Sequence, residues 1–138
     1  MSLVVAAALV DDLTDPTVVL ATRRSYPSAL AGRWEFPGGK VHDGEAPVDA
    51  LHRELAEELE ITAVVDAEIV GPCAGAWPLV PPHRMRLWLA AVASGSPRAC
   101  GAHNELRWLP VRDLHHLPWL DPDRPIVAEL QRRLAPGL

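Results

Sequence analysis

A cluster of glutamates in a segment with helical periodicity constrains the fold of this chain more than any other feature. Glu54, Glu57 and Glu58 are three and four positions apart, so on a helix they lie on one face. An apolar stripe recurs at the same kind of spacing: Val48, Leu51, Leu55 and Leu59. Proline is favoured in the first turn of a helix, so the sequence predicts an amphipathic helix that starts near Pro47 and runs to about Leu59.

The acidic face of this helix has two interpretations. Like charges this close destabilise a helix by on the order of a few tenths of a kcal/mol per pair, and such a face is usually a solvated surface. Here Arg53 stands beside the glutamates and can orient one of them. Glu45 and the glycine turn at residues 38–39 precede the helix, so backbone carbonyls can converge on the same point. Several carboxylates and a carbonyl suit a hard cation, which predicts a site for Mg²⁺ or Mn²⁺.

The residues around these glutamates resemble the sequence motif of the Nudix family of hydrolases. That motif reads G-x5-E-x7-R-E-U-x-E-E-x-G-U, where U is an apolar residue. Its positions are filled at the right spacing by Gly39, Glu45, Arg53, Glu54, Leu55, Glu57, Glu58 and Ile61. Glu60 stands where the motif has its last glycine, at a helix end where glycine favours a left-handed turn. This departure concerns the local backbone shape more than the metal site.

Further segments are similar to the MutT branch of the Nudix family, which includes 8-oxo-dGTP diphosphatases and CTP or dCTP pyrophosphohydrolases. These segments are residues 22–24, 34–40, 106–108 and 123–125. The resemblance implies an α/β (α+β) fold with a mixed β-sheet between helices, as a single domain over residues 1–138. It also implies an enzyme of nucleotide-pool sanitation and DNA repair, which hydrolyses a (deoxy)nucleoside triphosphate to the monophosphate and pyrophosphate.

The same resemblance implies roles for individual residues. The expected metal ligands are the Gly38 carbonyl, Glu54, Glu57 and Glu58. The expected catalytic residues are Arg53, Glu54 and Glu57. Arg53 would hold Glu54 in place, and Glu54 or Glu57 would orient or deprotonate water. The expected substrate-binding residues are Arg24, Phe36, Gly39, Lys40 and Asp123. Glu45 is expected to brace the loop before the helix.

Selectivity for the base is expected to depend on Phe36, as a pocket wall, and on Asp123. An ionised Asp123 would accept a hydrogen bond from an amino group such as N4 of cytosine, which favours CTP or dCTP. A protonated Asp123 in an apolar pocket could donate to a purine carbonyl and so permit 8-oxo-dGTP. The alternative for Asp123 is a plain helix N-cap, and the alternative for Arg24 is a surface arginine at a strand end.

One acidic residue expected from the resemblance is missing. Related enzymes often place a further glutamate six residues before the tryptophan of the late strand, and counting back from Trp108 gives Ala102. The neighbours that could substitute are His103, Asn104 and Glu105. The identity of the general base therefore stays open.

Other functions remain as alternatives. The substrate could be ADP-ribose, a nucleotide sugar or a dinucleoside polyphosphate, although enzymes for these tend to carry residues outside the motif that a chain of this length has little room for. A different class is a Nudix-fold nucleotide sensor without activity. Such domains usually lose the carboxylates that this chain keeps.

The composition restricts the class of protein further. The chain has 138 residues, of which 49% are hydrophobic and 22% charged, as in one globular domain. The net charge of −5 argues against binding duplex nucleic acid, which requires a basic face. Residues 1–10 are apolar, lack Lys and Arg and are too short to span a bilayer, so a buried strand, a cytoplasmic location and no membrane contact are expected. Cys73 and Cys100 are interpreted as reduced thiols.

Shorter apolar runs predict the rest of the sheet. Strands are expected over residues 3–10, 18–22, 34–36, 64–70, 85–93 and 106–109. Residues 37–39 are interpreted as a sharp turn and residues 71–82 as a loop rich in Pro and Gly. A last helix is expected over residues 124–134, and the five tryptophans are expected to pack in the core and its rim. The oligomeric state and the number of metal ions are left open.

Overall fold

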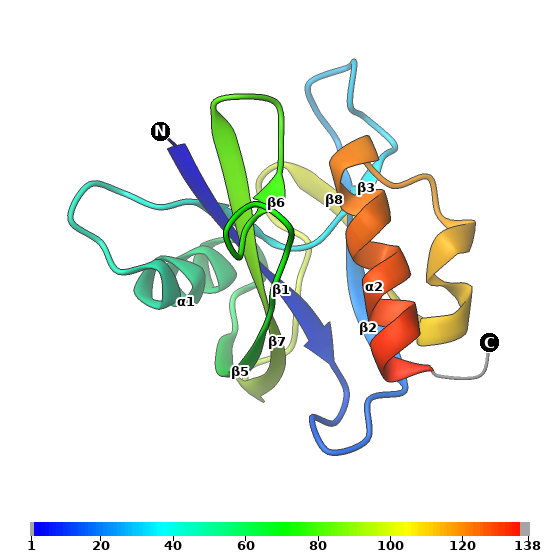
Figure 1. Cartoon of the computed structure of the whole chain (residues 1–138). Helices are drawn as coiled ribbons and strands as arrows, with labels where there is room; N and C mark the ends of the chain where they lie inside the picture. Colours follow the sequence, from blue (N-terminus) through cyan, green and yellow to red (C-terminus); the bar gives the residue numbers. More distant parts are fainter. Residues whose placement is uncertain (1, 136–138) are drawn as a thin grey trace.

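The computed structural model describes residues 2–135, which form a mixed sheet with helices on both faces (Figure 1). The strands are β1 (Ser2–Val10), β2 (Val18–Arg24), β3 (Trp34–Glu35), β4 (Gly38–Lys40), β5 (Thr62–Ile69), β6 (Trp77–Pro78), β7 (His83–Ser94) and β8 (His103–Pro110). The helices are α1 (Pro47–Leu59) and α2 (Arg124–Leu134), with the 3₁₀ helices η1 (Val111–His116) and η2 (Asp121–Asp123) before α2. This architecture confirms the expected α+β class.

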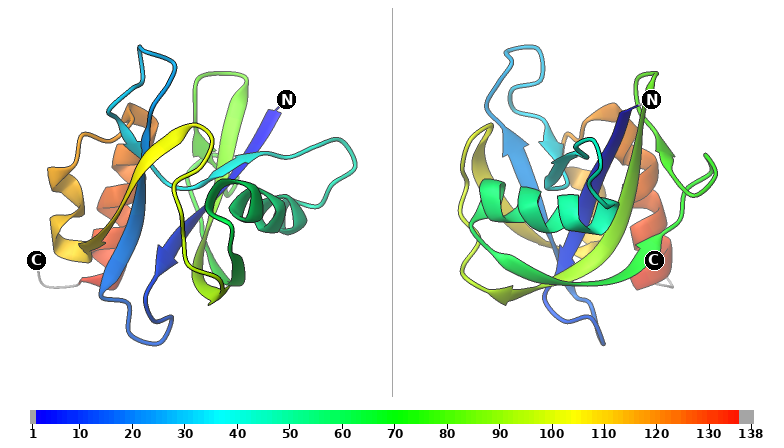
Figure 2. Two further views of the ribbon diagram at one scale, coloured as in Figure 1. Left: turned by 180° about the vertical axis from the view of Figure 1, so that it is seen from behind. Right: turned by 90° about the vertical axis from the view of Figure 1, so that its left-hand side faces the viewer.

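Strand β1 is the centre of the sheet. It pairs in parallel with β7, from Ser2 opposite His83 to Val10 opposite Ala91, and antiparallel with β4. Its register with β2 consists of a single antiparallel pair, Val10 opposite Val19. Strands β5 and β6 extend the sheet from β7, whereas β3 and β8 pair with β2. The sheet therefore consists of two halves that meet near the end of β1 (Figure 2).

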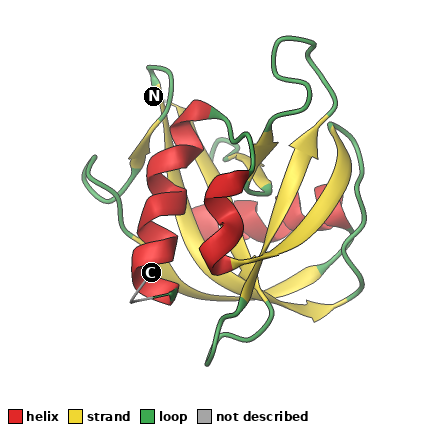
Figure 3. Cartoon of the chain, turned by 90° about the vertical axis from the view of Figure 1, so that its right-hand side faces the viewer, coloured by secondary structure: helices red, strands yellow, loops and turns green. Residues whose placement is uncertain are grey.

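Alternation along β1 builds two apolar cores. Successive side chains of a strand point to opposite faces. Ala6, Ala8 and Val10 belong to the core that packs beneath α2. Val5, Ala7 and Leu9 belong to the core beneath α1. Figure 3 shows the two helices on opposite sides of the strands. Burial on both faces explains why β1 is a nearly continuous apolar run and confirms that it is a buried strand.

Three local predictions were wrong. Residues 38–40 form strand β4 rather than only a turn, because glycine lets this backbone lie directly against β1. A Cβ added at Gly38 would collide with the backbone of Val5. The predicted loop at residues 71–82 contains β6, in which Trp77 pairs with Met85 of β7. Val48 is 37% exposed instead of being part of the apolar stripe, and Ala50 is buried in its place.

The helix end at Glu60 keeps the shape that the missing glycine would give. Glu60 has φ 58° and ψ 41°, in the left-handed region, and its N–H donates to the Ala56 carbonyl at 3.1 Å. Gly95 packs on this turn, since a Cβ at Gly95 would approach the Glu60 carbonyl oxygen to 2.8 Å. The close packing therefore imposes on a glutamate a backbone conformation that glycine adopts more easily.

The other predicted helices and strands are present, although β5, β7 and β8 begin two or three residues earlier than predicted. Helices α1 and α2 have the predicted bounds. Trp34, Trp77, Trp88 and Trp119 are buried, whereas Trp108 is 40% exposed and forms part of the rim. Cys73 and Cys100 are both free and half-buried. Between residues 2 and 135, no helix is long and apolar enough to cross a membrane.

Candidate active site

The acidic face of α1 lies over the glycine strand β4. Leu51, Leu55 and Leu59 are fully buried beneath α1 and fix which way the helix is turned. Glu54 consequently lies directly above Gly39, where an added Cβ would collide with the Glu54 carboxylate. Gly39 is thus required for the close approach of the β4 backbone and the Glu54 carboxylate.

Arg53 connects the loop before α1, the end of β4 and the acidic face through five hydrogen bonds. Its Nε and Nη2 donate to Glu45 Oε2 and Oε1 at 2.9 and 3.0 Å. Its Nη1 donates to Glu54 Oε1 at 2.9 Å and to Glu57 Oε2 at 3.3 Å. Its Nη2 also donates to the Lys40 carbonyl at 2.9 Å. The loop before α1, the end of β4 and two of the three glutamates are therefore held by one guanidinium group, whose planar fork suits this task.

Glu45 braces the loop before α1. The Arg53 guanidinium, and then the His42 N–H that reaches Glu45 Oε1 at 3.1 Å, lower the pKa of Glu45 to about 2. Glu45 does not reach the glutamates of the acidic face itself, because Arg53 stands between them. Its role is that of a structural anchor for Arg53.

Glu58 is the carboxylate of the acidic face that lies against Gly38. Its Oε2 accepts a hydrogen bond from the Gly38 N–H at 3.2 Å. Burial raises the pKa of Glu58 to about 7, and the negative charges of Glu35 and Glu54 act in the same direction. His103 and the Gly38 N–H oppose this shift. The raised pKa marks a place where negative charge is incompletely compensated, and a bound cation would relieve it.

The donor chemistry of the acidic face fits a hard divalent cation. Glu54, Glu57 and Glu58 supply carboxylate oxygens from one side of α1, and Gly38 lies against them. In the part of the chain that the structure describes, no three His, Cys, Asp or Glu side chains stand close enough together to hold one ion. Glu57 is 60% exposed, and its contact with Arg53 Nη1 is long, at 3.3 Å, so a change of rotamer costs it little. Oxygen ligands of this type suit Mg²⁺ or Mn²⁺, provided that the flexible glutamates converge upon binding.

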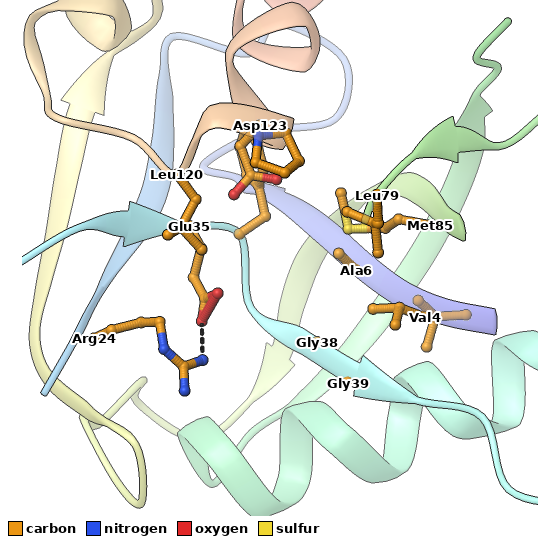
Figure 4. A pocket seen from close by; sticks show the side chains of 13 residues that line it. Val4, Ala6, Arg24, Glu35, Gly38, Gly39, Leu79, Met85, Leu120 and Asp123 are labelled. Atoms are coloured by element: carbon orange, nitrogen blue, oxygen red, sulfur yellow. Dashed lines mark hydrogen bonds and ion pairs between the residues drawn. The ribbon is translucent and has the colours of Figure 1, made fainter. Parts of the chain in front are cut away.

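A cavity of about 190 Å³ opens beside the acidic face. Residues from several separate segments of the chain line it, among them Arg24, Glu35, Phe36, Gly38, Gly39 and Asp123 (Figure 4). The structure thus brings together four of the five predicted substrate-binding residues. Lys40 is exposed at the end of β4 and does not line this cavity; only its carbonyl takes part, as an acceptor for Arg53.

Arg24 and Phe36 are both held by neighbours. Arg24 Nη1 donates to Glu35 Oε2 at 3.0 Å, and its Nε donates to the Tyr26 carbonyl at 3.0 Å. Phe36 is 4% exposed and stacks on Trp119, with the ring centroids 4.8 Å apart. Arg24 is therefore an oriented arginine of the cavity rather than a free surface arginine, and Phe36 is a fixed part of its apolar wall.

Asp123 behaves differently from a helix N-cap. It occupies the N-cap position of α2, yet its side chain makes no capping hydrogen bond, and the residue is 4% exposed. Burial raises the pKa of Asp123 to about 8, and the nearby negative charge of Glu35 adds to the shift. A carboxyl group with this pKa is mostly protonated at neutral pH and can both donate and accept hydrogen bonds.

The site includes two further polar residues, Glu35 and His103, which are not positions of the Nudix motif. Glu35 lines the cavity between Arg24 and Asp123. Of the three neighbours of Ala102, His103 turns inward, where its Nε2 lies 2.8 Å from Glu35 Oε2. Asn104 instead accepts from Arg23 Nε at 2.9 Å, and Glu105 pairs with Arg23 and Arg107 away from the cavity. The sequence signal for Glu35 was its place in segment 34–40, which resembles the MutT branch.

Comparisons with known proteins agree with the motif and the fold. The NUDIX domain model matches residues 1–130. A Mycobacterium tuberculosis protein named "Putative 8-oxo-dGTP diphosphatase 2" is 39% identical over 132 residues, which cover 96% of this chain and 89% of that protein. The CTP pyrophosphohydrolase of Escherichia coli is 48% identical over 61 residues, covering 44% of this chain and 43% of that protein.

Solved structures show the same similarity. The ORF135 protein of Escherichia coli matches with a TM-score of 0.75 and 30% identity, over 100% of this chain and 95% of that one. A structure from work on MutT of Aliivibrio salmonicida and Vibrio cholerae matches with a TM-score of 0.69 and 26% identity, over 94% and 95% of the two chains.

Proposed function

Because this chain belongs to the NUDIX family and is a Nudix hydrolase, we propose that it uses Mg²⁺ to cleave a (deoxy)nucleoside triphosphate to the monophosphate and pyrophosphate. The proposed substrates are 8-oxo-dGTP and the cytidine nucleotides CTP and dCTP. One observation carries the proposal: the acidic face of α1 lies against the glycines of β4, beside a cavity that holds Arg24 and Asp123.

In the proposed reaction, water attacks a phosphorus atom in line with the leaving group. A new P–O bond forms as the bond between that phosphorus and the departing product breaks, so the protein has to supply positioning and compensation of charge. A bound Mg²⁺ would neutralise phosphate oxygens and polarise water. The proposed ligands are Glu54, Glu57, Glu58 and the Gly38 carbonyl.

Each residue of the acidic face has a distinct proposed task. Arg53 fixes Glu54 through the bond at 2.9 Å and does not need to touch substrate. Glu57 is exposed and bonded only weakly to Arg53, at 3.3 Å, so it is able to turn towards the water and the metal. Glu54 or Glu57 would then accept the proton of the attacking water.

Base recognition is proposed to depend on Asp123 in its protonated form. The O–H group can donate to a base carbonyl while the second oxygen accepts from a base N–H or amino group. This dual capacity supports 8-oxo-dGTP, which presents carbonyl and N–H groups, and it also permits cytosine, which presents an amino group beside a ring nitrogen. The apolar wall made by Phe36 gives these polar contacts a dry surrounding.

A substrate panel tests the proposed function. Initial rates of pyrophosphate release would be measured with Mg²⁺, and with EDTA in its place, for 8-oxo-dGTP, dGTP, CTP, dCTP, ADP-ribose and a dinucleoside polyphosphate. One of the proposed triphosphates should exceed the other classes by about tenfold or more in kcat/KM, a difference of about 1.4 kcal/mol. A higher kcat/KM for ADP-ribose or for the dinucleoside polyphosphate would show that the proposed substrate class is wrong. If a nucleotide is bound but not cleaved, the chain is a nucleotide sensor and the proposed hydrolysis is wrong.

The role of Asp123 is tested by a pair of substitutions. Asp123→Asn keeps a donor and an acceptor, so KM should stay within about fivefold of the parent value. Asp123→Leu is of similar size and has neither group, so KM should rise by about tenfold or more, as expected when polar groups of a bound base are left unpaired. Equal KM values for the two variants would show that Asp123 does not recognise the base.

A further inference from the structure

His103 lies between two carboxylates that belong to different parts of the site. Its Nε2 is 2.8 Å from Glu35 Oε2 at the cavity, and its Nδ1 is 3.8 Å from Glu58 Oε2 on α1. The imidazole side chain is 1% exposed. Polar side chains as deeply buried as this one generally have defined hydrogen-bond partners and a defined orientation. The environment therefore fixes how His103 points.

An irregularity in the strand pairing accounts for this orientation. Along β2, Arg23 lies opposite Glu105, but the next residue, Arg24, lies opposite His103, so Asn104 is an extra residue in β8. Regular alternation would place His103 on the same side as Glu105, which pairs with surface arginines. The extra residue reverses this alternation and turns His103 towards α1 and the cavity. Bulges next to active sites commonly redirect a side chain in this way.

One of the two carboxylate oxygens of Glu35 is held in place by hydrogen bonds. Its Oε2 accepts hydrogen bonds from both Arg24 Nη1 and His103 Nε2, and its backbone carbonyl accepts from Thr22 Oγ1 at 3.0 Å. Within residues 2–135, its Oε1 has no hydrogen-bond partner. Glu35 lines the cavity together with Asp123, and Figure 4 shows it between Arg24 and Asp123. A fixed acceptor oxygen is thus available to a ligand in this cavity.

The direction of the contact between His103 and Glu35 follows from Arg24. A guanidinium group only donates, so Glu35 Oε2 accepts from Arg24, and the second bond to the same oxygen is a donation from His103 Nε2–H. The Nδ1 atom is buried and has no hydrogen-bond partner in the described part of the chain. Within the described residues, the imidazole therefore makes one hydrogen bond, from Nε2–H to Glu35 Oε2.

We propose that His103 is a positioning residue for nucleotide recognition: it holds Glu35 so that Oε1 accepts a hydrogen bond from an N–H or O–H group of the bound nucleoside. This inference rests on the proposed function and adds Glu35 to Asp123 as a second recognition group. His103 acts through Glu35 and does not touch the substrate. Its loss should weaken binding of the nucleotide more than it slows the chemical step.

Two substitutions of His103 separate positioning from a merely structural role. His103→Gln places an amide N–H near the position of Nε2 and can still donate to Glu35, whereas His103→Leu cannot. For the leading triphosphate with Mg²⁺, we expect His103→Leu to raise KM by about tenfold or more and to leave kcat within about threefold. His103→Gln should keep KM within about threefold of the parent value. His116→Leu, at an exposed histidine of η1, is the control and should change neither constant.

The double variant with Glu35→Gln tests whether the two residues act as a unit. Glu35→Gln should also raise KM, and the effects of Glu35→Gln and His103→Leu should be far from additive, because both remove the same contact. Parent KM in a folded His103→Leu variant would overturn the inference. So would a KM of His103→Gln as high as that of His103→Leu, or a loss of kcat without a change in KM.

A binding measurement keeps this inference distinct from the proposed function. Calorimetric titration of the metal-free protein with 8-oxo-dGMP and with CMP should show weaker binding to His103→Leu by a factor similar to the change in KM. If the parent protein binds but hydrolyses nothing, and His103→Leu still weakens binding, the proposed hydrolysis fails and the recognition role stands. If the parent hydrolyses and both variants bind as the parent does, the recognition role alone fails. Thermal melting of each variant identifies a loss of fold, and His103→Gln provides the test if His103→Leu does not fold.

Discussion

The backbone N–H of Gly38 donates a hydrogen bond to Glu58 Oε2 at 3.2 Å, across a separation of 20 residues in sequence. This bond holds the C-terminal half of α1 against β4. The side chains of Glu54 and Glu58 are only 13% and 22% exposed. The acidic face of α1 is therefore not an ordinary solvated surface, since two of its three carboxylates are held close to the backbone of another element.

Glu57 gives the most direct mutational test of the acidic face. We expect Glu57→Gln to lower kcat by about two orders of magnitude or more, because a proposed metal ligand and proton acceptor loses its charge. The side chain is 60% exposed, so the melting temperature should not change appreciably. Asp49→Asn, at an exposed acidic residue of the same helix, should leave kcat unchanged. Parent-like turnover in Glu57→Gln would rule out Glu57 as a metal ligand.

Arg53 should be irreplaceable by lysine. Lysine keeps the positive charge but lacks the planar fork that reaches Glu45, Glu54 and the Lys40 carbonyl together. We expect Arg53→Lys to lower both the melting temperature and kcat, the latter by about tenfold or more, since Glu54 loses its orientation.

Arg86→Lys is the matched control for Arg53→Lys. Arg86 binds both oxygens of Glu68 at 2.9 and 2.7 Å, and neither residue lines the cavity. This substitution should lower the melting temperature and leave kcat unchanged. A similar loss of kcat in both variants would show that the effect at Arg53 comes from stability alone.

The left-handed residue at the end of α1 predicts a stabilising substitution. Glu60→Gly should raise the free energy of unfolding by about 1 kcal/mol, because glycine adopts positive φ without the steric cost of a Cβ. Glu60→Ala removes the same ion pair with Arg98 but keeps the Cβ, and it should bring no gain. Urea denaturation measures both effects. Equal stability of the two variants would show that the backbone conformation at Glu60 is not strained.

Asp123 should give the stability of the protein a recognisable pH dependence. Its pKa is raised to about 8, so the folded state binds this proton more tightly than the unfolded state does. The resulting stabilisation is complete below the ordinary pKa of an aspartate and is lost as the pH rises towards 8. Relative to Asp123→Asn, the parent protein should therefore lose free energy of unfolding between pH 5 and 8, by at most about 1.4 kcal/mol per pH unit.

Urea denaturation at several pH values, in EDTA, measures this dependence. Glu58, whose pKa is also raised, contributes in the same direction to both proteins and cancels in the difference. A difference that is constant with pH would show that Asp123 does not bind its proton more tightly in the folded state.

Periodicity and motif spacing predicted the parts of this protein in which local sequence decides structure. The bounds of α1 and α2 followed from apolar spacing and from proline in the first turn. Strand β4 was not predicted because two consecutive glycines are typical of a turn. In the structure these glycines let the backbone pack closely against β1 and pair with it as a strand. The place of His103 depends on an extra residue in β8, and such a change of register leaves no periodic trace in a single sequence.

The role of Asp123 could not be predicted from the local sequence either. Its position before α2 predicted either an N-cap or a recognition residue, and only the surrounding burial distinguishes them. The pKa of a carboxyl group depends on neighbours brought together by the fold, here the apolar surroundings and Glu35.

The central claim is that the acidic face of α1 makes this chain a metal-dependent pyrophosphohydrolase, and ³¹P NMR of the products tests it most directly. The protein would be incubated with 8-oxo-dGTP, and separately with CTP, in the presence of Mg²⁺. We expect equal amounts of nucleoside monophosphate and pyrophosphate, and no reaction in EDTA or with Glu57→Gln. Release of orthophosphate and a nucleoside diphosphate, or cleavage that continues unchanged in EDTA, would contradict the claim.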